Sequence, residues 1–424
     1  MESPDLHVLV LAGGESTRVR TGGPKALLDL CGRPLLDHLL RAAEGVQAVS
    51  RTLVLGSSHR APLEAWLQES RHRDWKTVIQ EQALGTGDAV RAGLEALPSQ
   101  GRVLILCGDT PLLQAETLQR MAAEKKNLLL TASLDDPFGY GRIMRTEDGD
   151  LVGIVEEADA DEETAAVQEV NAGVYLLDLA GLRAAVAGLR TDNAQGEFYL
   201  THAVLELLAE QGGVTLCLED GGEEILGVNT LPDLAEASFH LRRRILQGHM
   251  SAGVVISDPA TTYIEDGVEI GPGSRILPFT VIRRGVRIGS SCMVGPFAHL
   301  RAGTVLADGS ELGNFVEAKN ADLGRGAKAK HLTYLGDVAV GAFANIGCGT
   351  ITANYDGRKK HRTEIGERAF IGSGTILVAP VRVGRNAVTG AGSVVPHDHD
   401  VPEGTTVLGV PARPFPHPAP SCPD

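Results

Sequence analysis

A six-residue repeat in the second half of the chain constrains its fold more than any other feature. Aliphatic residues recur at every sixth position from Ile264 to Leu312, and the same spacing returns from Ile365 to Val383. Glycine directly follows many of these aliphatic residues. A sustained period of six is typical of a three-sided parallel β-helix, in which each side is one short strand and one turn, with an aliphatic side chain pointing inward. We therefore predict an all-β, left-handed parallel β-helix over residues 251–410.

The repeat is interrupted twice. Its phase slips around Leu323–Gly324, and a longer interruption runs from Asn354 to Glu364. The longer interruption contains the basic tract Arg358–Arg362 in a chain whose formal net charge is −15. Insertions in solenoid proteins form loops outside the stack, and although basic tracts are usually only solvated, this one lies where a repeat breaks. We expect this loop to contribute to a site for an anionic ligand.

The first half of the chain has a different pattern of apolar and polar residues. Residues 1–230 alternate apolar runs with amphipathic segments, which is typical of an α/β fold with a mainly parallel, Rossmann-like sheet covered by helices. Ligands of such sheets bind beyond the carboxyl ends of the strands. The predicted strands are His7–Leu11, Arg51–Leu55, Thr77–Ile79, Val103–Cys107, Leu128–Ser133 and Val174–Leu177, and the predicted helices are Leu35–Ala43, Asp88–Leu97, Ala115–Lys125 and Glu197–Gln211.

Two further segments complete the predicted organisation. Residues 231–250 have the pattern of one connecting helix, with Pro232 in its first turn and arginines followed by Gly248 near its end. Residues 411–424 are rich in proline, so we expect a flexible tail.

The overall composition narrows the classes of function. The chain has 424 residues, enough for two or three domains, and it contains no apolar stretch of the length that a membrane span requires. Its six cysteines form no CxxC pair, so neither a disulfide framework nor a zinc site is indicated. The acidic net charge argues against a general nucleic-acid binder. We expect a cytoplasmic, soluble protein that binds small anionic molecules, and neither nucleic acid nor a membrane.

A glycine loop near the N-terminus is the first candidate site. Leu11, Ala12, Gly13 and Gly14 follow the predicted strand His7–Leu11, and the cations Arg18 and Lys25 come shortly after. Backbone N–H groups at such glycines can approach an anion closely, which favours a phosphate cradle. The loop matches neither the Walker A nor the dinucleotide-binding pattern, and an ordinary turn between strand and helix explains it equally well.

Three more segments of this half carry residue types suited to a nucleotide site. Asp109 follows the strand Val103–Cys107, where its carboxylate could hold Mg²⁺ over phosphates or simply cap a helix. The segment Gln80–Gly87 ends at the start of a helix, whose N-terminus favours an anion. The segment Phe138–Ile143 has two glycines that would let a ligand ring lie against the backbone, although hairpins also use such glycines.

Taken together, the motifs of both halves resemble the bifunctional N-acetylglucosamine-1-phosphate uridyltransferase and glucosamine-1-phosphate N-acetyltransferase family, GlmU, over nearly the whole chain. The two most specific motifs lie in the β-helix. The matching segments are Leu11–Arg18 with Pro24 and Lys25, Leu84–Gly87, Gly108–Leu112, Gly139–Arg142, Ile154–Glu157, Asn193–Glu197, Gly227–Asn229, Val294–Arg301, Asn314–Lys319, Lys330–Asp337 and Asn345–Gly357.

For the first half, the resemblance implies magnesium-dependent uridylyl transfer, in which a sugar 1-phosphate oxygen attacks the α-phosphate of UTP and pyrophosphate leaves. Asp109 and Asn229 would hold Mg²⁺, and Arg18 and Lys25 would act in catalysis by neutralising triphosphate charge. The implied contacts at the nucleotide site are Leu11, Ala12, Gly13, Gly14, Gln80, Gly85, Thr86, Cys107, Gly108 and Asn229. Gly141, Glu156 and Asn171 would hold the sugar. This chemistry needs alignment and charge neutralisation rather than a protein nucleophile.

For the second half, the resemblance implies acetyl transfer from acetyl-CoA to the amine of glucosamine 1-phosphate. His331 would be the general base, because imidazole titrates near neutral pH, and Glu317 would orient it or the amine. The implied substrate contacts are Arg301, Lys319, Tyr334, Asn345 and Lys360, and the implied acetyl-CoA contacts are Cys348, Asn354, Tyr355, Ser373 and Ala391.

The resemblance further implies a homotrimer whose acetyl site forms where neighbouring β-helices meet. Several positions depart from the family pattern, among them Gly13 with Gly14, Cys348, Ser16 and Gly409. Ser16 replaces a glycine of the first motif, and Gly409 stands where many members have an arginine that contacts CoA, with Arg413 nearby.

Two other functions are compatible with the same motifs. One is a nucleotidyltransferase of a single activity, using another nucleotide or sugar, whose β-helix only oligomerises or regulates it. The other is a nucleotide sensor on a solenoid scaffold, without catalysis.

Overall fold

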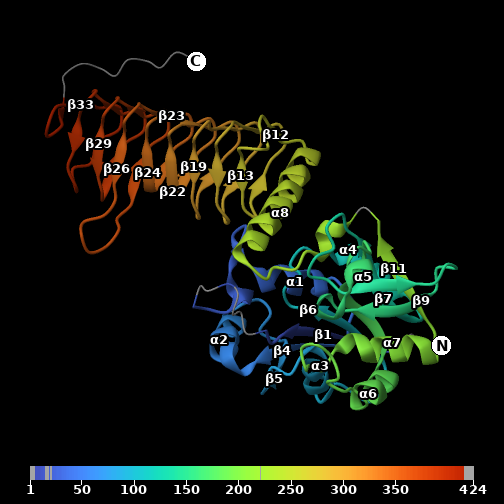
Figure 1. Cartoon of the computed structure of the whole chain (residues 1–424). Coiled ribbons are helices and arrows are strands. Elements are labelled where there is room, and N and C mark those ends of the chain that lie inside the picture. Colours follow the sequence, from blue (N-terminus) through green and yellow to red (C-terminus); the bar gives the residue numbers. More distant parts are fainter. Residues whose placement is uncertain (1–4, 15–18, 20–21, 220, 415–424) are drawn as a thin grey trace. The chain divides into compact units, whose positions relative to one another are not determined.

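The computed structural model describes residues 5–14, 19, 22–219 and 221–414 (Figure 1). The chain divides into two compact units, one ending at Phe239 and the other starting at His240. The division falls inside the long helix α8 (Leu231–Ser251). No helix in the described ranges combines the length and hydropathy needed to cross a membrane.

The first unit is built on a mainly parallel sheet, as the sequence predicts. Its main path runs β11-β7-β10-β6-β1-β4-β5, and β1 pairs in parallel with both β4 and β6. The longest strand, β10, runs antiparallel to β6 and β7, and the hairpin of β8 and β9 extends from it. The bounds are β1 Leu6–Ala12, β4 Ser50–Gly56, β5 Lys76–Gln80, β6 Arg102–Cys107, β7 Asn127–Ser133, β8 Arg142–Arg145, β9 Leu151–Val155, β10 Glu169–Asp178 and β11 Gly213–Leu218; β2 (Asp29–Leu30) and β3 (Arg33–Pro34) form a separate small pair.

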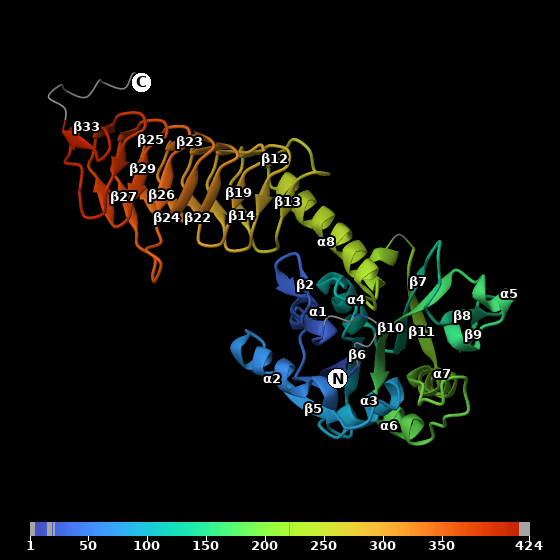
Figure 2. The same ribbon diagram turned by 60° about the vertical axis from the view of Figure 1, so that its left-hand side comes forward.

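Helices cover both faces of this sheet (Figure 2). One apolar core contains buried residues of α1, α2 and α4, and a second contains those of α3, α6 and α7, so each face is buried under its own helix layer. The bounds are α1 Leu35–Glu44, α2 Arg60–Glu69, α3 Thr86–Leu94, α4 Ala115–Ala123, α5 Glu162–Ala165, α6 Leu179–Ala187 and α7 Leu200–Gln211, with 3-10 turns η1 Lys25–Leu27, η2 Ser57–His59, η3 Glu157–Asp159 and η4 Gly222–Ile225.

All six predicted strands and all four predicted helices of this unit are present, with shifted ends. The helix α7 begins three residues later than predicted because Asn193 and Glu197 close a loop instead: the Asn193 amide donates to the Glu197 carbonyl at 2.6 Å. The helix α3 ends at Leu94, three residues before its predicted end. The pattern missed the helices α2, α5 and α6 and the strands β2, β3, β8, β9 and β11.

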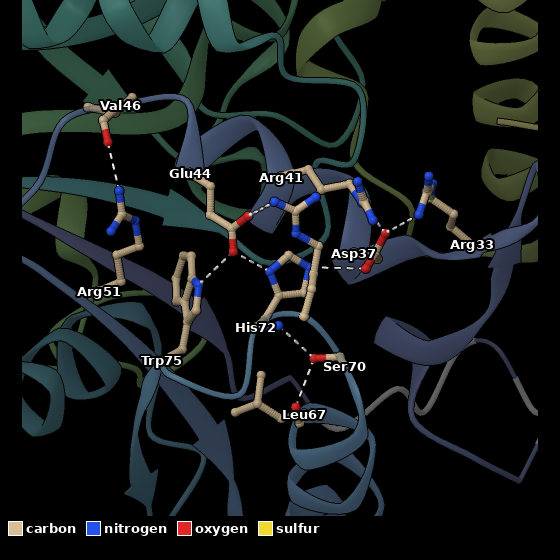
Figure 3. A network of polar contacts seen from close by, with 11 residues as sticks. Arg33, Asp37, Arg41, Glu44, Val46, Arg51, Leu67, Ser70, His72 and Trp75 are labelled. Atoms are coloured by element: carbon tan, nitrogen blue, oxygen red, sulfur yellow. Dashed lines mark hydrogen bonds and ion pairs between the residues drawn. The ribbon is translucent and has the colours of Figure 1, made fainter. Parts of the chain in front are cut away.

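A buried ion network ties the segment after α2 to α1 (Figure 3). The side chain of His72 is fully buried, its Nε2 lies 3.0 Å from an oxygen of Asp37, and its Nδ1 lies 2.5 Å from an oxygen of Glu44. Arg41 pairs with Asp37 at 2.6 Å, and the Trp75 indole donates to Glu44 at 3.3 Å. Since both carboxylates belong to α1, this network holds α2 and the start of β5 against that helix.

The second unit is a left-handed parallel β-helix with three faces, as predicted. Equivalent residues on one face are eighteen apart, so that Tyr263 pairs with Val281 and Val281 with His299. Its strands are β12 Val255–Ile256, β13 Tyr263–Ile264, β14 Glu269–Ile270, β15 Arg275–Ile276, β16 Val281–Ile282, β17 Arg287–Ile288, β18 Met293–Val294, β19 His299–Leu300, β20 Val305–Leu306, β21 Glu311–Asn314, β22 Glu317–Leu323, β23 Lys328–His331, β24 Tyr334–Val340, β25 Asn345–Ile346, β26 Ile351–Ala353, β27 Thr363–Ile365, β28 Phe370–Ile371, β29 Ile376–Val378, β30 Val381–Val383, β31 Val388–Thr389, β32 Val394–Val395, β33 Thr406–Leu408 and β34 Arg413–Pro414.

The aliphatic residues of the repeat form the interior. Among those that define the period, Ile276, Leu300 and Leu377 are fully buried, whereas Ile270 near the start of the helix is only partly buried. Burial of one aliphatic side chain per short strand supplies the apolar area that stabilises the stack. The strand β34 pairs with β33, so the first residues of the predicted flexible tail belong to the β-helix, and residues 415–424 lie outside the described part.

The two interruptions of the repeat have distinct structural causes. At the first, Glu317 pairs with Tyr334 and Tyr334 pairs with Ile351, so two successive coils are each one residue shorter than the eighteen-residue coils, and β22 and β24 continue from one face to the next. At the second, Val338 pairs with Thr363, so the coil carries seven extra residues. They lie within the loop 354–362 between β26 and β27, which projects from the stack (Figure 2).

Candidate active sites

A pocket of about 480 Å³ lies at the carboxyl ends of the central strands of the first unit. Such a position follows from the mainly parallel sheet, whose strand ends meet at one edge. The predicted residues that line it are Leu11, Ala12, Gly13, Gly14, Lys25, Gln80, Gly85, Thr86, Cys107, Gly108, Asp109 and Asn229. The structure therefore brings together residues more than two hundred positions apart in sequence.

Two glycines of this pocket, Gly13 and Gly108, pack closely against their neighbours, whereas a Cβ atom at Gly14 would meet no atom of the described residues within 4 Å. A Cβ atom at Gly13 would lie 2.6 Å from the side-chain oxygen of Gln80, and one at Gly108 would lie 2.7 Å from the carbonyl of Leu11. The Gly108 N–H donates to that same carbonyl at 2.8 Å. These contacts hold β1 and the segment after β6 together beside the pocket.

A cation and two oxygen donors converge at one end of the pocket. The Lys25 ammonium lies 2.9 Å from a carboxylate oxygen of Asp109 and 3.1 Å from the amide oxygen of Asn229. The two oxygens thus face one point in space, from loops that follow β6 and precede α8. One carboxylate and one amide oxygen are donors of the kind that Mg²⁺ prefers when phosphates complete its coordination.

Gln80 and Gly85 order the opposite wall of the pocket. The Gln80 amide donates to the carbonyl of Gly85 at 3.1 Å and to Asp88 at 3.0 Å. Gly85 has φ +105°, and a Cβ atom there would lie 2.8 Å from the Phe198 carbonyl, so glycine is needed for both reasons. The helix α3 starts directly afterwards at Thr86 and points its N-terminus at the pocket wall.

The three predicted sugar contacts form a separate cluster outside this lining. The Asn171 N–H donates to the carbonyl of Gly141 at 2.8 Å, and a Cβ atom at Gly141 would lie 3.3 Å from Glu156. Burial raises the pKa of Glu156, although the hydroxyl of Thr201 donates to its carboxylate at 2.8 Å. Asn171 is itself held by the hydroxyl of Tyr175, to which its amide donates at 2.8 Å.

Several features of this pocket were not predicted. His59, Leu63 and Glu197 line it, and the first two belong to η2 and α2, which the sequence pattern did not reveal. Burial raises the pKa of the Cys107 thiol to about 12, so this pocket residue is a neutral thiol, which donates to the Gly173 carbonyl. Arg18 and Ser16 lie outside the described residues.

The second site lies along one corner of the β-helix. Asn314 pairs with His331 across neighbouring coils, and backbone hydrogen bonds from Gly374 to Cys348 and from Gly392 to Ser373 continue the alignment upward. We call this row of aligned positions the His331 column; its members are Asn314, His331, Cys348, Ser373 and Ala391. The Nδ1 atom of His331 lies 2.7 Å from the amide oxygen of Asn314.

A cluster of cations occupies the neighbouring face. Arg301 pairs with Glu317 at 2.9 Å, and Lys319 lies one coil above Arg301 on β22. Hydrogen bonding and charge from the neighbouring Lys360 lower the pKa of Lys319, so the inserted loop brings its ammonium group to this face. Such like charges at close range favour an anion that both can contact.

The remaining predicted residues are distributed around these two features. Tyr334 on β24 pairs with Glu317 on β22. Asn345 on β25 pairs with Lys328 on β23, and Lys328 lies three residues before His331 on that strand. The Asn354 amide donates to Asp337, and the exposed Tyr355 pairs with Lys360 across the inserted loop.

The position of the replaced arginine is also described. Gly409 is exposed and has φ +95°, and Leu408 beside it pairs with Arg413 of β34. Arg413 thus lies opposite the last residue of β33, next to Gly409.

Within the described residues there is no group of three or more histidine, cysteine, aspartate and glutamate side chains that could hold a metal ion. The pair of Asp109 and Asn229 is therefore incomplete as a metal site without oxygens from a bound substrate.

Comparison with known proteins finds family matches in both units. A model of the MobA-like NTP transferase domain matches residues 8–169, and a model of six bacterial transferase hexapeptide repeats matches residues 362–397. Bifunctional protein GlmU of Mycobacterium tuberculosis (strain ATCC 25177 / H37Ra) is 41% identical over 446 residues, covering 95% of this chain and 90% of that protein. Bifunctional protein GlmU of Trichlorobacter lovleyi is 43% identical over 430 residues, covering 92% of this chain and 93% of that protein. Since the similarity spans both architectures, the chain belongs to the GlmU family.

Proposed function

We propose that this chain is a bifunctional enzyme that makes UDP-N-acetylglucosamine. Its β-helix acetylates glucosamine 1-phosphate with acetyl-CoA, and its α/β unit then transfers UMP from UTP to the product, releasing pyrophosphate. The observation that carries the proposal is the presence, in one member of the GlmU family, of a pocket with Lys25, Asp109 and Asn229 and of the His331 column on a separate unit.

In the α/β unit, the chain's own residues bind and align the reactants. The backbone of Leu11–Gly14 and the wall formed by Gln80 and Gly85 bind the nucleotide, and Lys25 contacts its phosphates. The cluster of Gly141, Glu156 and Asn171 binds the acetylated sugar. Holding the sugar phosphate oxygen in line with the α-phosphate supplies most of the rate enhancement, because no protein nucleophile takes part.

The oxygens of Asp109 and Asn229 would hold Mg²⁺ in this site. They suit it because both already face one point, which the Lys25 ammonium contacts. When bound, the ion would neutralise the charge that develops on the phosphates. Lys25 would then turn to a phosphate oxygen.

In the β-helix, His331 accepts the proton that the sugar amine loses as it attacks the acetyl thioester. Asn314 fixes the ring through Nδ1, which leaves Nε2 to act as the base. Lys319, Lys360 and Arg301 bind the sugar phosphate, with Glu317 holding Arg301. The higher members of the His331 column and the loop residues Asn354 and Tyr355 bind acetyl-CoA.

We further propose that the protein is a cytoplasmic homotrimer. An exposed row of stacked aromatic rings supports association: Phe279 and Phe297 are 4.7 Å apart, and Phe297 and Phe315 are 5.2 Å apart. Each ring is about half exposed, and Phe315 directly follows Asn314 of the His331 column. Water-exposed aromatic rows of this kind mark contact surfaces.

Product assays test the proposal. With Mg²⁺, the protein should release pyrophosphate from UTP and N-acetylglucosamine 1-phosphate, and it should release CoA from acetyl-CoA and glucosamine 1-phosphate. Parallel assays with dTTP and with the non-acetylated sugar measure the preference. Pyrophosphate release without any CoA release would favour the alternative of a single-activity nucleotidyltransferase, which family membership does not favour.

A further inference from the structure

One tyrosine joins the two loops that carry the sugar and metal residues of the α/β unit. The loop 138–142 contains Gly141, and the segment 225–229 contains Asn229, about ninety positions later. The hydroxyl of Tyr140 accepts a hydrogen bond from the Gly227 N–H at 3.2 Å and donates to the Ile225 carbonyl at 3.4 Å. Its ring packs against the apolar core, which also contains Ile225.

The segment 225–229 is held at each of its last three positions. The Val228 N–H donates to the Asp109 carbonyl at 2.8 Å, and the Asn229 N–H donates to the carboxylate of Asp233 at 2.8 Å. The Tyr140 hydroxyl holds Gly227, two residues before the amide oxygen that faces Lys25. We therefore expect that removing this hydroxyl changes the position of the Asn229 side chain.

The loop 138–142 is held from the other side by an ion pair whose arginine is buried and whose glutamate is partly exposed. Arg142 is 1% exposed and lies 2.8 Å from Glu157, whose carboxylate accepts from the Gly139 N–H at 2.9 Å. The Arg142 guanidinium also donates to the carbonyls of Tyr140 and Ala165.

These contacts bear directly on the sugar cluster. The Gly141 carbonyl accepts from the Asn171 N–H at 2.8 Å, and a Cβ atom at Gly141 would lie 3.3 Å from Glu156. The loop therefore lies directly against Glu156 and Asn171 at Gly141.

We propose that the Tyr140 hydroxyl is a positioning group that couples occupancy of the sugar subsite at Gly141 to occupancy of the metal site at Asn229. The inference rests on the proposed uridylyl transfer. A sugar that orders the loop also orders Gly227, and a metal ion that orders Asn229 also orders the loop. Because such coupling is reciprocal, Mg²⁺ should tighten sugar-nucleotide binding by more than its own contacts with the phosphates provide.

Binding of UDP-N-acetylglucosamine, measured by isothermal titration calorimetry, tests this coupling without turnover. The dissociation constant is measured in Mg²⁺ and in EDTA for the wild type and for Tyr140→Phe, which keeps the ring and removes the hydroxyl. We expect the ratio of the dissociation constant in EDTA to that in Mg²⁺ to fall about fivefold in the variant, which is the effect of losing one hydrogen bond. A merely structural role would weaken binding equally in both conditions and leave the ratio unchanged, which would overturn the proposal.

Two controls separate this proposal from the function on which it rests. Tyr263→Phe, on β13 of the β-helix, should leave the ratio at the wild-type value, and acetyl transfer by Tyr140→Phe should remain within twofold of wild type. A wild type that binds the sugar nucleotide with the same affinity in Mg²⁺ and EDTA would refute the coupling alone. A wild type that binds it in neither condition would refute the proposed uridylyl transfer as well.

Discussion

Replacing His72 with alanine should destabilise the α/β unit strongly, although His72 lies outside the pocket. Its imidazole contacts carboxylate oxygens of Asp37 at 3.0 Å and Glu44 at 2.5 Å, and its side chain is fully buried (Figure 3). Hydrogen bonds to charged groups contribute about 1.5–3 kcal/mol each. The ring also packs between Trp66 and Trp75, with centroids 6.0 and 6.4 Å away, so its removal leaves a cavity.

The two carboxylates keep other partners, which limits the loss. Arg41 remains 2.6 Å from Asp37, and Arg71 remains 3.2 Å from Glu44. We therefore expect the cost to fall near the lower end of the range for a broken buried ion pair, about 3 kcal/mol. For a unit of this size that loss lowers the melting temperature by roughly 6–12 °C.

The loss of stability in His72→Ala should also depend on pH. Burial alone would raise the pKa of Asp37, but hydrogen bonds from His72 and Arg41 outweigh burial and hold that pKa well below its usual range. A carboxyl with a depressed pKa stabilises the folded state above its unfolded pKa, roughly pH 4, and this stabilisation disappears as pH falls through the folded pKa. The difference between wild type and His72→Ala should be greatest above that pH and shrink in stronger acid.

Thermal inactivation of uridylyl transfer, with acetyl transfer of the same sample as internal reference, measures this effect. Arg60→Ala is a matched control on α2, because its ion pair with Glu64 is exposed and contributes less than about 1 kcal/mol. A melting temperature of the α/β unit within 2 °C of wild type, roughly 1 kcal/mol or less, would refute the reasoning about the network.

Three further changes test the two sites. Lys360→Met should raise KM for glucosamine 1-phosphate about tenfold with kcat within twofold, because a cation that we propose contacts the phosphate is lost; initial-rate kinetics measure this, and an unchanged KM would contradict it. Gly85→Ala should destabilise the α/β unit by about 1–3 kcal/mol and weaken UTP binding, since φ is +105° and Phe198 leaves no room for a Cβ atom; wild-type thermal stability would refute this. Asn314→Ala should lower kcat of acetyl transfer about tenfold with little change in KM, because Nδ1 of His331 loses its 2.7 Å partner; wild-type kcat would show that the ring needs no such support.

The β-helix was the part of the fold that the sequence predicted best, for a physical reason. Each short strand must bury one aliphatic side chain, so the six-residue period is written directly into residues such as Ile276 and Leu300. The same pattern located the inserted loop 354–362, because an insertion outside the stack breaks the period without changing it on either side.

The α/β unit shows where such reasoning stops. The helix α2 was missed because only Leu63 and Leu67 of its ten residues are buried, which is too weak a periodic signal. No local sequence pattern predicts that His72 is buried, because its partners Asp37 and Glu44 lie about thirty positions away in the chain. Burial of polar groups depends on tertiary partners, which local propensity does not encode.

The candidate sites divide in the same way. Motifs and the family resemblance predicted the glycine loop, Asp109 and His331 as site residues, because phosphate and proton chemistry restrict the residue types that can serve, and their roles stay predictions. The role that we propose for Tyr140 depends on contact with Gly227, eighty-seven positions later, which no motif predicts. His59 lines the pocket from η2, a 3-10 turn that was not predicted.

The central claim is that one chain holds two independent active sites, and paired variants test it most directly. Both activities are measured on Asp109→Ala and His331→Ala at matched protein concentration, with folding checked by circular dichroism and oligomeric state by light scattering. We predict that Asp109→Ala abolishes pyrophosphate release and retains CoA release, and that His331→Ala does the reverse. Loss of both activities in either folded variant would contradict the account.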